Sequence, residues 1–565
     1  MSPTIHPLVT ELSTIASQLR VDVLACLGLV VLVPYLYVRQ RRSKLNTRIS
    51  TVNSEKLGDE GNLTKPLSLP PGPPSWPIFG YLPGLPKVKV WEVFNKWAET
   101  YGDIIYVPNF KNHIIILNSA EAIFELLERR GNIYSDRPHM VMMQLMTFDR
   151  STAFAHYGSN WRRHRKLYNQ QMNITAVSKF RGYQSAAAQS LLANLLDSPE
   201  DFARHCRTFS AAIVMNISYG HQIAPQNDQV VQLSEATGLA FSQASQPGYY
   251  MVDNFPILQH VPSFFPFASF QRLAEEIRKA TYRSRTIPFR RVVDGMKKGD
   301  AKRCFVSDSL NDLNGVDLSS SGEKDFDVEE FENREDVSLI KDVAGGIFGA
   351  GSATTTSALH SFMLAMVMFP RVQKRAQEEL DHVLGLGRLP TFEDQSQLPY
   401  IGAIVREVLR WFPVTPSALP HTTTEDDVYK GYLIPKGTIL IPNVRSLLHD
   451  PKIYPNPDEF RPERFLPDKN GNIARDPAAQ GAFGFGRRIC AGRNLAEASI
   501  WISAASLLAV FDITPALDEN GKPIDVKPAF AGAPGFFDHP LPFKCRIEPR
   551  SERAKKIILD NCSTA

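Results

Sequence analysis

The stretch GAFGFGRRICAGRNL, residues 481–495, places a single cysteine, Cys490, between glycines and arginines and directly before an apolar helical pattern. Glycines let a backbone turn tightly and pass close to a bulky group, and arginines bring fixed positive charge with forked donors that suit a carboxylate. Because Cys490 precedes a helix N-terminus, free backbone N–H groups and the helix dipole are expected to stabilise its thiolate. Such a thiolate is a metal ligand or a nucleophile, although an isolated cysteine is most often a small buried hydrophobe.

Five residues of this stretch match every fixed position of a known loop, FxxGxRxCxG: Phe483, Gly486, Arg488, Cys490 and Gly492. This is the haem-binding loop of the haem-thiolate monooxygenases, so the chain resembles the cytochrome P-450 superfamily. The resemblance implies that Cys490 is the axial ligand of the iron in a haem b, where a thiolate pushes electron density toward the iron and favours O–O cleavage. It also implies that the other four residues hold the cofactor.

The composition is that of a large globular protein. The chain has 565 residues, of which 43% are hydrophobic and 22% charged, and its 63 basic and 59 acidic residues leave a formal net charge of +4. This nearly balanced charge implies no nucleic-acid partner. The six cysteines are scattered without a CxxC pair, which argues against a disulfide framework or a zinc cluster.

An apolar run near the N-terminus predicts a membrane anchor. Residues 21–38, VDVLACLGLVVLVPYLYV, follow a tail at 1–20 and approach the length needed to span a bilayer. The alternative is a cleaved secretory signal, but no small-residue cleavage pattern follows. The basic sequence RQRRSK comes directly after the run, which places the following chain in the cytosol. We therefore expect a single-pass anchor in the endoplasmic reticulum membrane, in contact with lipid, and a basic and polar linker at 39–69.

Two further motifs fit a haem carboxylate. Trp161 and Arg165 lie at i and i+4 on one helix face within the basic run WRRHRK, which by itself would usually be a solvated face. The resemblance implies that this indole and guanidinium donate to a haem propionate. The other basic residues of the run would face an acidic reductase or be solvated. His421 follows Leu-Pro at a position where many members of the family have an arginine or histidine that contacts a haem propionate. A lone histidine is, however, more often a core or surface residue whose hydrogen bonds are made within the protein.

Residues 338–369 predict a long apolar helix with several glycines in its middle. Mid-helix glycines indicate either the close approach of a large ligand or close helix packing. The resemblance makes this segment the distal helix that crosses the haem, in which Thr354 holds water and delivers protons. Ala350 and Gly351, together with Val414 farther along the chain, are expected to line the substrate pocket.

One position of this helix departs from the family pattern. Ala353 stands where the family has an acidic residue that supplies a proton route, and an alanine cannot relay a proton. Ser352, Thr355 and water could replace the route, a substrate hydroxyl could replace it, or oxygen activation could be compromised. We favour a substitute relay because Thr354 is retained.

Glu407 and Arg410 lie at i and i+3 of a predicted helix, where an ion pair forms readily. The motif alone is weak, because exposed pairs contribute little to stability. It is followed by FRPERF, residues 460–465, and the resemblance implies that the last arginine of this segment, Arg464, joins the pair in a network that braces the loop carrying the cysteine. We expect these three residues to be structural supports without a catalytic role.

Residues 236–270 are rich in Tyr, Phe, Met and Pro, and the segment is too apolar for a solvated loop. Core packing is the simplest explanation. Contact with the membrane interface beside a substrate entrance is the alternative, and it agrees with the predicted anchor.

The resemblance covers residues 70–550, which we assign to one catalytic domain with the cytochrome P-450 fold, mainly α with a minor β portion. A C-terminal tail is expected at 551–565. Within the domain, the alternation at 103–107 and 113–117 predicts a β-hairpin. The last part of the domain looks like fungal microsomal members of the O-methylsterigmatocystin oxidoreductase type.

The resemblance implies a monooxygenase that inserts one oxygen atom from O₂ into a hydrophobic small molecule, a terpenoid or polyketide of fungal secondary metabolism. Electrons would come from NADPH through a separate NADPH–cytochrome P-450 reductase, because no flavin or nicotinamide module is evident in this chain. Two alternatives remain open. One is a haem-thiolate isomerase or dehydratase that rearranges a peroxide without a reductase, which the absent acid at Ala353 favours slightly. The other is a non-catalytic haem sensor or carrier.

Overall fold

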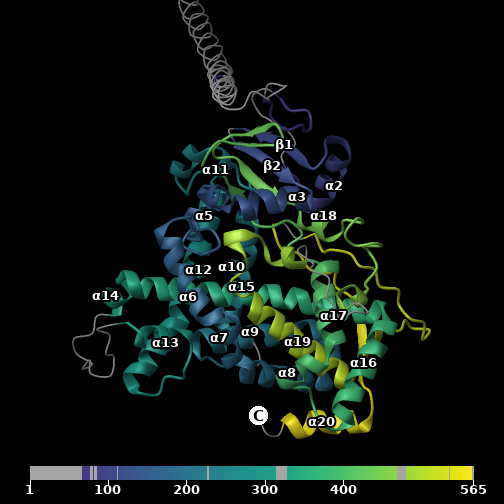
Figure 1. Ribbon diagram of the computed structural model, residues 1–565. Helices are drawn as coiled ribbons and strands as arrows, with labels where there is room; N and C mark the ends of the chain where they lie inside the picture. Colours follow the sequence, from purple (N-terminus) through teal and green to yellow (C-terminus); the bar gives the residue numbers. More distant parts are fainter. Residues whose placement is uncertain are drawn as a thin grey trace, which may run out of the picture.

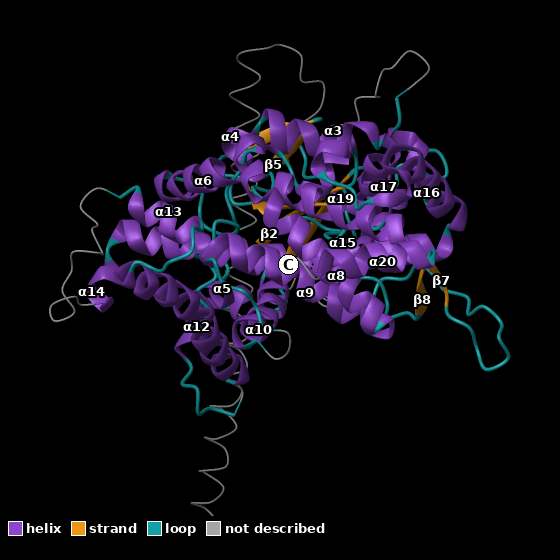
Figure 2. Ribbon diagram, turned by 90° about the horizontal axis from the view of Figure 1, so that it is seen from below, coloured by secondary structure: helices purple, strands orange, loops and turns teal. Residues whose placement is uncertain are grey.

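The computed structural model describes residues 47, 67–76, 81, 85–110, 112–224, 228–266, 268–313, 328–467, 479–532 and 535–562. This part of the chain is mainly helical and contains three small sheets (Figures 1 and 2). The strands β1 and β2 lie at one end of the molecule, and the long helices fill the rest (Figure 1). The predicted fold class, mainly α with a minor β portion, is confirmed.

The described helices differ widely in length, from single turns to the 34 residues of α15. The π-helical turn is η1 (Phe124–Arg129), and the 3-10 turns used below are η4 (Pro256–His260), η8 (Ala479–Phe483) and η9 (Gly486–Arg488). The α-helices are α2 (Val90–Tyr101), α3 (Ala120–Ile123), α4 (Gly131–Tyr134), α5 (Val141–Leu145), α6 (Ser159–Met172), α7 (Ile174–Val177), α8 (Arg181–Asp197), α9 (Phe202–Tyr219), α10 (Gln229–Ala244), α11 (Met251–Asn254), α12 (Ser269–Lys298), α13 (Phe305–Asn311), α14 (Val328–Asn333), α15 (Glu335–Met368), α16 (Pro370–Leu384), α17 (Pro399–Trp411), α18 (Val444–Leu448), α19 (Arg493–Val510) and α20 (Glu552–Cys562).

The largest sheet has four strands in the order β1-β2-β6-β3. Strands β1 (Ile104–Asn109) and β2 (Asn112–Leu117) pair in antiparallel fashion, which confirms the predicted hairpin. Strand β2 also pairs in parallel with β6 (Ile439–Pro442), whose other edge holds β3 (His421–Thr422). The sheet therefore fixes His421 beside Leu440. The remaining strands form two antiparallel pairs, β4 (Asp427–Tyr429) with β5 (Tyr432–Ile434), and β7 (Phe511–Pro515) with β8 (Cys545–Pro549).

Helix α15 runs through the middle of the helical part, between α9, α10, α12 and α19 (Figure 2). Its first turn carries Glu335 and Asp336, whose negative charge suits a helix N-terminus. It ends before Pro370, because the residue that precedes a proline disfavours helical backbone. Buried apolar residues occupy almost every side of α15, as expected of a helix enclosed in a core.

The proline-rich segment at 67–76 lies against the edge strand β1. The N–H of Tyr106 donates to the carbonyl of Pro71 at 2.8 Å. A Cβ on Gly72 would lie 1.8 Å from the carbonyl oxygen of Tyr106, so only glycine permits this approach. The predicted tail at 1–20, the predicted anchor at 21–38 and nearly all of the linker lie outside the described residues. No helix within the described ranges has the length and apolarity required to cross a bilayer.

The predicted C-terminal tail contains the helix α20, which packs on α8 and α19 (Figure 1). Ala554 and Ile558 are the buried residues of this contact. Just before the helix, Arg550 forms a two-pronged ion pair with the carboxylate of Asp381 on α16, with N–O distances of 2.9 and 2.6 Å. The segment is therefore part of the folded body.

A fully buried ion pair connects α17 to the chain that follows β6. Nε and Nη2 of Arg410 donate to the carboxylate of Glu407 at 2.7 and 2.8 Å, and both side chains are 0% exposed. Nη1 of Arg410 also donates to the carbonyls of Leu448 and Pro457. Nε of Arg464 lies 3.4 Å from Oε1 of Glu407. The structure thus brings together the three predicted supports, and α17 and α18 pack on η8, which leads into the cysteine loop.

We predict that Glu407→Gln strongly destabilises the protein, because it leaves the Arg410 guanidinium buried without its counter-charge. Breaking a buried pair typically costs about 3–5 kcal/mol. The free energy of unfolding measured with chemical denaturant checks this. Glu548→Gln is the control, since it removes the carboxylate of a largely exposed pair with Arg546 and should change little. Equal losses in both variants would contradict the supporting role of Glu407.

Candidate functional site

The cysteine loop joins η8 to α19 and depends on two glycines. Gly484 and Gly486 have φ values of 83° and 55°, which other residues rarely adopt. A Cβ on Gly486 would lie 2.1 Å from the carbonyl oxygen of Leu127 in η1, so the loop can rest on this turn only with glycine there. The N–H of Cys490 donates to the carbonyl of Phe483 at 2.8 Å and closes the loop. The predicted motif residues therefore determine how the cysteine is presented.

The side chain of Cys490 is accessible although protein surrounds it closely. It is exposed, yet burial is the largest influence on the thiol and raises its pKa. These two observations agree if protein surrounds the sulfur while a hollow adjoins it. The N–H of Gly492 and the charges of Arg165 and Arg493 lower the pKa, as expected for a helix N-terminus, but burial outweighs them. A cation in the hollow would reverse this balance, because a coordinating thiol loses its proton.

Helix α6 places the predicted pair Trp161 and Arg165 beside this loop. Trp161 is buried, and the guanidinium of Arg488 lies 4.6 Å from the centre of its ring. Nη1 of Arg165 donates to the carbonyl of Ile489, the neighbour of Cys490, at 2.7 Å. Arg488 in turn donates to backbone carbonyls at Ser135, Thr152 and Ala155.

Arg137 is a buried cation that the sequence analysis missed. Its Nη1 donates to the carbonyls of Leu419 and Pro420 at 3.1 and 2.6 Å. The next residue, His421, is also buried, and its Nδ1–H donates to the carbonyl of Tyr134 at 2.8 Å. An arginine in a loop before a proline is normally read as solvated, so nothing in the sequence distinguishes Arg137. Its burial depends on residues 419–421, which are distant in the chain.

These four basic side chains form what we call the cation cluster: Arg137, Arg165, Arg488 and His421. Burial lowers the pKa of each, to about 10 for Arg488 and well below the ordinary value for Arg137 and His421. The hydrogen bonds described above go to backbone carbonyls. The nearby carboxylate is Asp136, which already accepts from the ring of His156 and from the N–H of Tyr157.

Buried positive charge requires an opposing charge, and the cation cluster has one carboxylate beside it in the described chain. Two further carboxylates in this place would compensate the cluster and accept its hydrogen bonds. The two propionates of a haem meet that requirement. Cys490 lies close to the cluster, because Arg165 donates to the carbonyl of the neighbouring residue Ile489. The residues present therefore fit a haem.

The middle of α15 is also accessible, in contrast to the rest of the helix core. Ala350 is exposed and Thr354 is half-buried, although the residues on either side of this stretch, such as Phe348 and Thr355, are buried. The hydroxyl of Thr354 donates to the carbonyl of Ala350 at 2.7 Å. Helix α6 contacts both this helix and the cysteine loop, because the Tyr168 hydroxyl donates to Val343 of α15 at 3.2 Å.

Three glycines of α15 are explained by packing rather than by a ligand. A Cβ on Gly345 would lie 2.6 Å from the side chain of Arg285 on α12, and one on Gly346 would lie 2.3 Å from the hydroxyl of Tyr168. A Cβ on Gly351 would lie 2.5 Å from Val214 on α9. Gly351 therefore belongs to the contact between α15 and α9, and its place in a pocket wall stays a prediction. Of the two explanations open from the sequence, helix packing accounts for all three.

The absent acid at Ala353 has no replacement on α15 nearby. The closest acidic residue on this helix is Asp342, three turns earlier. Its carboxylate is paired with Arg150 and Arg285 at 2.9 and 3.1 Å. Val414, the other predicted wall residue, is half-buried, and its carbonyl accepts from the N–H of Asp538 at 2.9 Å.

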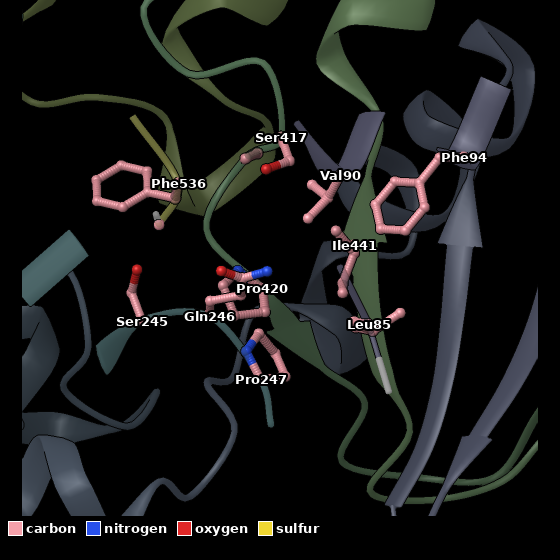
Figure 3. Close-up of a pocket in the computed structure, with 12 residues that line it drawn as sticks. Leu85, Val90, Phe94, Ser245, Gln246, Pro247, Ser417, Pro420, Ile441 and Phe536 are labelled. Atoms are coloured by element: carbon pink, nitrogen blue, oxygen red, sulfur yellow. The ribbon is translucent and has the colours of Figure 1, made fainter. Parts of the chain in front are cut away.

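A crevice lies between the loop after α10 and the sheet end of the molecule (Figure 3). Its walls are mostly apolar and come from five segments far apart in the chain. The floor at 417–420 is the segment whose carbonyls hold Arg137, so the crevice adjoins the cation cluster. The lining residues are Leu85, Val90, Phe94, Ser245, Gln246, Pro247, Ser417, Ala418, Pro420, Ile441, Gly535 and Phe536.

The apolar segment at 236–270 is not explained by core packing alone. Val252 is buried, but Ile257 and Phe264 are 75% and 84% exposed. Phe255 contacts the ring of Phe110 in the β1–β2 turn with centroids 4.9 Å apart, so the segment lies at the sheet end of the molecule. We call its exposed members the apolar patch: Met251, Phe255, Ile257, Phe264 and Phe265.

Comparison with known proteins connects this geometry to a family. Residues 70–544 match the family model for cytochrome P-450. The chain is 40% identical over 498 residues to cytochrome P-450 monooxygenase COX2 of Coprinopsis cinerea, covering 88% of this chain and 92% of the relative. It is 40% identical over 494 residues to cytochrome P-450 monooxygenase ple1 of Rhodocybe pseudopiperita, with 87% and 91% covered. It is 37% identical over 497 residues to tryptamine 4-monooxygenase of Psilocybe cyanescens, with 87% and 94% covered.

The family match spans most of the chain, the relatives are fungal monooxygenases, and the residues around Cys490 fit the cofactor that the family binds. The chain belongs to the cytochrome P-450 family, whose cofactor is haem.

Proposed function

We propose that this protein is a membrane-anchored haem-thiolate monooxygenase that inserts one oxygen atom from O₂ into a hydrophobic small molecule of fungal secondary metabolism, a terpenoid or polyketide. One observation carries the proposal: the accessible thiol of Cys490 lies beside a cluster of buried and half-buried cations that has one carboxylate, Asp136, next to it in the described chain. Relatives named as monooxygenases, including one that acts on tryptamine, support oxidation of a small molecule.

In this proposal the chain binds and orients the cofactor through its own charges. Cys490 would ligate the iron, and the cation cluster with the indole of Trp161 would hold the two propionates. With its Nδ1–H bonded to Tyr134, His421 has Nε2 free to meet a propionate, and a carboxylate there would favour protonation of the ring. Haem bound in this way supplies the activation of O₂ and the transfer of one oxygen atom to the substrate.

On the α15 side, Thr354 would hold a proton close to the reacting atoms. Its hydroxyl is fixed by its bond to Ala350 and retains lone pairs that can accept from water. Because Ala353 cannot continue the route, the hydroxyls of Ser352 and Thr355, water or a substrate hydroxyl would complete it. The missing acid also favours a second candidate, a haem-thiolate isomerase or dehydratase that rearranges a peroxide without added electrons.

Electrons would arrive from NADPH through a cytochrome P-450 reductase that docks near the cysteine loop. Arg162, Arg163 and Lys166 are exposed on α6. The guanidinium groups of Arg162 and Arg487 lie 5.9 and 5.4 Å from the centre of the Tyr157 ring. A basic surface beside the cofactor site would steer an acidic partner.

The catalytic domain would face the cytosol, with the predicted anchor in the endoplasmic reticulum membrane and the apolar patch resting on the lipid interface. Two observations support this arrangement. The segment at 67–76 reaches the sheet through β1, and the apolar patch is attached to the same end through Phe110 (Figure 1). Exposed aromatic and aliphatic side chains gathered in one place are favourable in contact with lipid.

We predict that Cys490→Ala abolishes the red-shifted Soret band that the reduced carbon-monoxide complex shows when a thiolate ligates the iron. Absorption spectra of purified protein, normalised to haem content, check this. Cys545→Ala is the matched control, because this half-buried cysteine lies on β8. A thiolate band that survives in Cys490→Ala would mean that another residue is the ligand.

We predict that Thr354→Ala separates NADPH consumption from product formation in the reconstituted system with reductase. Positioned proton transfer typically contributes roughly 10²–10⁴-fold, so product formed per NADPH should fall by about tenfold or more. The substrate is chosen by titrating a ligand panel for the spin-state change of the haem.

Thr356→Ala is the control for this prediction, because Thr356 makes the same bond to the carbonyl four residues back but is buried. Unchanged coupling in Thr354→Ala would remove Thr354 from the mechanism. Product formed by the wild-type enzyme without NADPH and reductase would instead favour the isomerase.

We predict that the apolar patch binds lipid. A form that lacks residues 1–44 should still associate with phospholipid vesicles in flotation assays, and Ile257→Asp with Phe264→Asp should abolish this association, because each charge would have to leave water. Ile174→Asp is the control, since this residue on α7 is 78% exposed but lies outside the patch. Equal flotation of all three forms would contradict a lipid-facing patch.

A further inference from the structure

Two exposed cations lie at the two ends of the segment that carries the apolar patch. Nη1 of Arg272, near the start of α12, donates to the carbonyl of Ser263 at 2.6 Å, so the guanidinium lies next to the backbone that carries Phe264. At the other end, Nζ of Lys87 lies 5.0 Å from the centre of the Tyr249 ring, two residues before the patch begins. Neither cation is paired with an acidic side chain within the described ranges.

The short segment that carries Lys87 is fixed to the same surface. The side chain of Gln246 donates to the carbonyl of Pro86, and the two residues that follow this proline are exposed, Val88 to 46%. The rings of Tyr249 and Tyr250 are 4.9 Å apart, and the patch starts at the next residue. Helix α11 and the helix α2 that follows this segment lie at the sheet end of the molecule (Figure 1).

The acidic charge of the patch segment is turned inward. Residues 246–270 include one acidic residue, Asp253. It is 6% exposed, and its Oδ1 accepts a backbone N–H of α5 at 2.9 Å. The next acids, Glu275 and Glu276, follow Arg272 by three and four residues on α12, and the first of them is paired with a lysine of the same helix. The exposed charge nearest the patch along the chain is therefore positive.

An apolar surface with positive charge beside it suits an anionic membrane. Exposed aromatic and aliphatic side chains enter the lipid interface, while neighbouring cations stay at the depth of the headgroups, whose phosphates and carboxylates accept their hydrogen bonds. The cytosolic leaflet is negatively charged, and the basic sequence at 39–44 predicts that the chain faces this leaflet. A second copy of the chain would bring the same positive charge and be repelled.

We propose that the apolar patch docks on an anionic lipid bilayer, and that Lys87 and Arg272 bind its negatively charged headgroups. The inference rests on the proposed function, which brings the patch to a membrane, and deepens it by naming the class of lipid. Arg272 keeps most of its guanidinium fork for a headgroup phosphate, because the bond to Ser263 uses a single N–H. Each cation close to an anionic surface favours binding by about fivefold.

The test follows docking of the haem-loaded full-length enzyme in lipid nanodiscs. A fluorophore on a small share of the headgroups is quenched by the haem when the catalytic domain rests on the bilayer, so quenching reports the ratio of docked to undocked domain. Phosphatidylcholine is compared with a mixture of phosphatidylcholine and phosphatidylserine. The wild-type enzyme should dock more on the mixture. Salt at about 1 M should remove the difference, because it shortens the Debye length to about 3 Å.

Lys87→Gln combined with Arg272→Gln should lower the docked-to-undocked ratio on the anionic mixture by about 25-fold and leave docking on phosphatidylcholine unchanged. The single variant Arg272→Lys keeps the charge and should keep the preference. Lys555→Gln combined with Lys556→Gln is the matched control, because it removes two exposed charges from α20, at the opposite end of the molecule from the sheet (Figure 1). The thiolate band of the carbon-monoxide complex shows that each variant is folded.

Equal docking of the wild-type enzyme on both bilayers would overturn the inference. An anionic preference that survives in the double variant would also overturn it and would assign the preference to the basic sequence at 39–44. Self-association that Ile257→Asp with Phe264→Asp removes would assign the patch to a second copy of the chain, with the same consequence. A wild-type enzyme that docks on neither bilayer would instead overturn the membrane arrangement of the proposed function, so the two failures are distinguishable.

Discussion

Positive charge gathered inside the protein, with only Asp136 beside it in the described part of the chain, is the constraint on which this structure depends. Arg137, Arg165, Arg488 and His421 come from the chain after α4, from α6, from the cysteine loop and from β3, and they meet in one place. Taking such groups out of water costs several kcal/mol each unless anions accompany them. The haem would therefore act as a counter-ion as well as a reagent, and its binding free energy would add to the stability of the fold.

The sequence predicts most of what is local in this arrangement. The glycines and the cysteine of the loop, the pair Trp161 and Arg165 on one helix face, and the pair Glu407 and Arg410 all act within a few residues of one another. Their spacing alone indicates their relation. The hairpin β1–β2 belongs to the same class, because a short turn joins two strands that are adjacent in the sequence.

Other features depend on contacts between segments that are far apart in the chain. Residue patterns in the sequence do not predict these contacts. Arg137 is buried by residues 419–421, and Gly351 is small because Val214 of α9 fills its place. The pKa of the Cys490 thiol also depends on segments that are distant in the chain. The helix N-terminus favours its thiolate as the sequence predicts, but burial by the surrounding protein, which the sequence does not reveal, has the larger effect on the pKa.

Helix α20 gives the chain beyond the matched region a structural role. It begins after the last residue that matches the family model, and it covers apolar surface on α8 and α19, the helix that follows the cysteine loop. A frameshift or stop codon beyond the matched region would spare every residue around the cofactor and still uncover the surface against which Ile558 packs. A truncation at these codons is therefore expected to destabilise the fold, as a substitution in the hydrophobic core would. It should not be classed with the harmless loss of an unstructured tail.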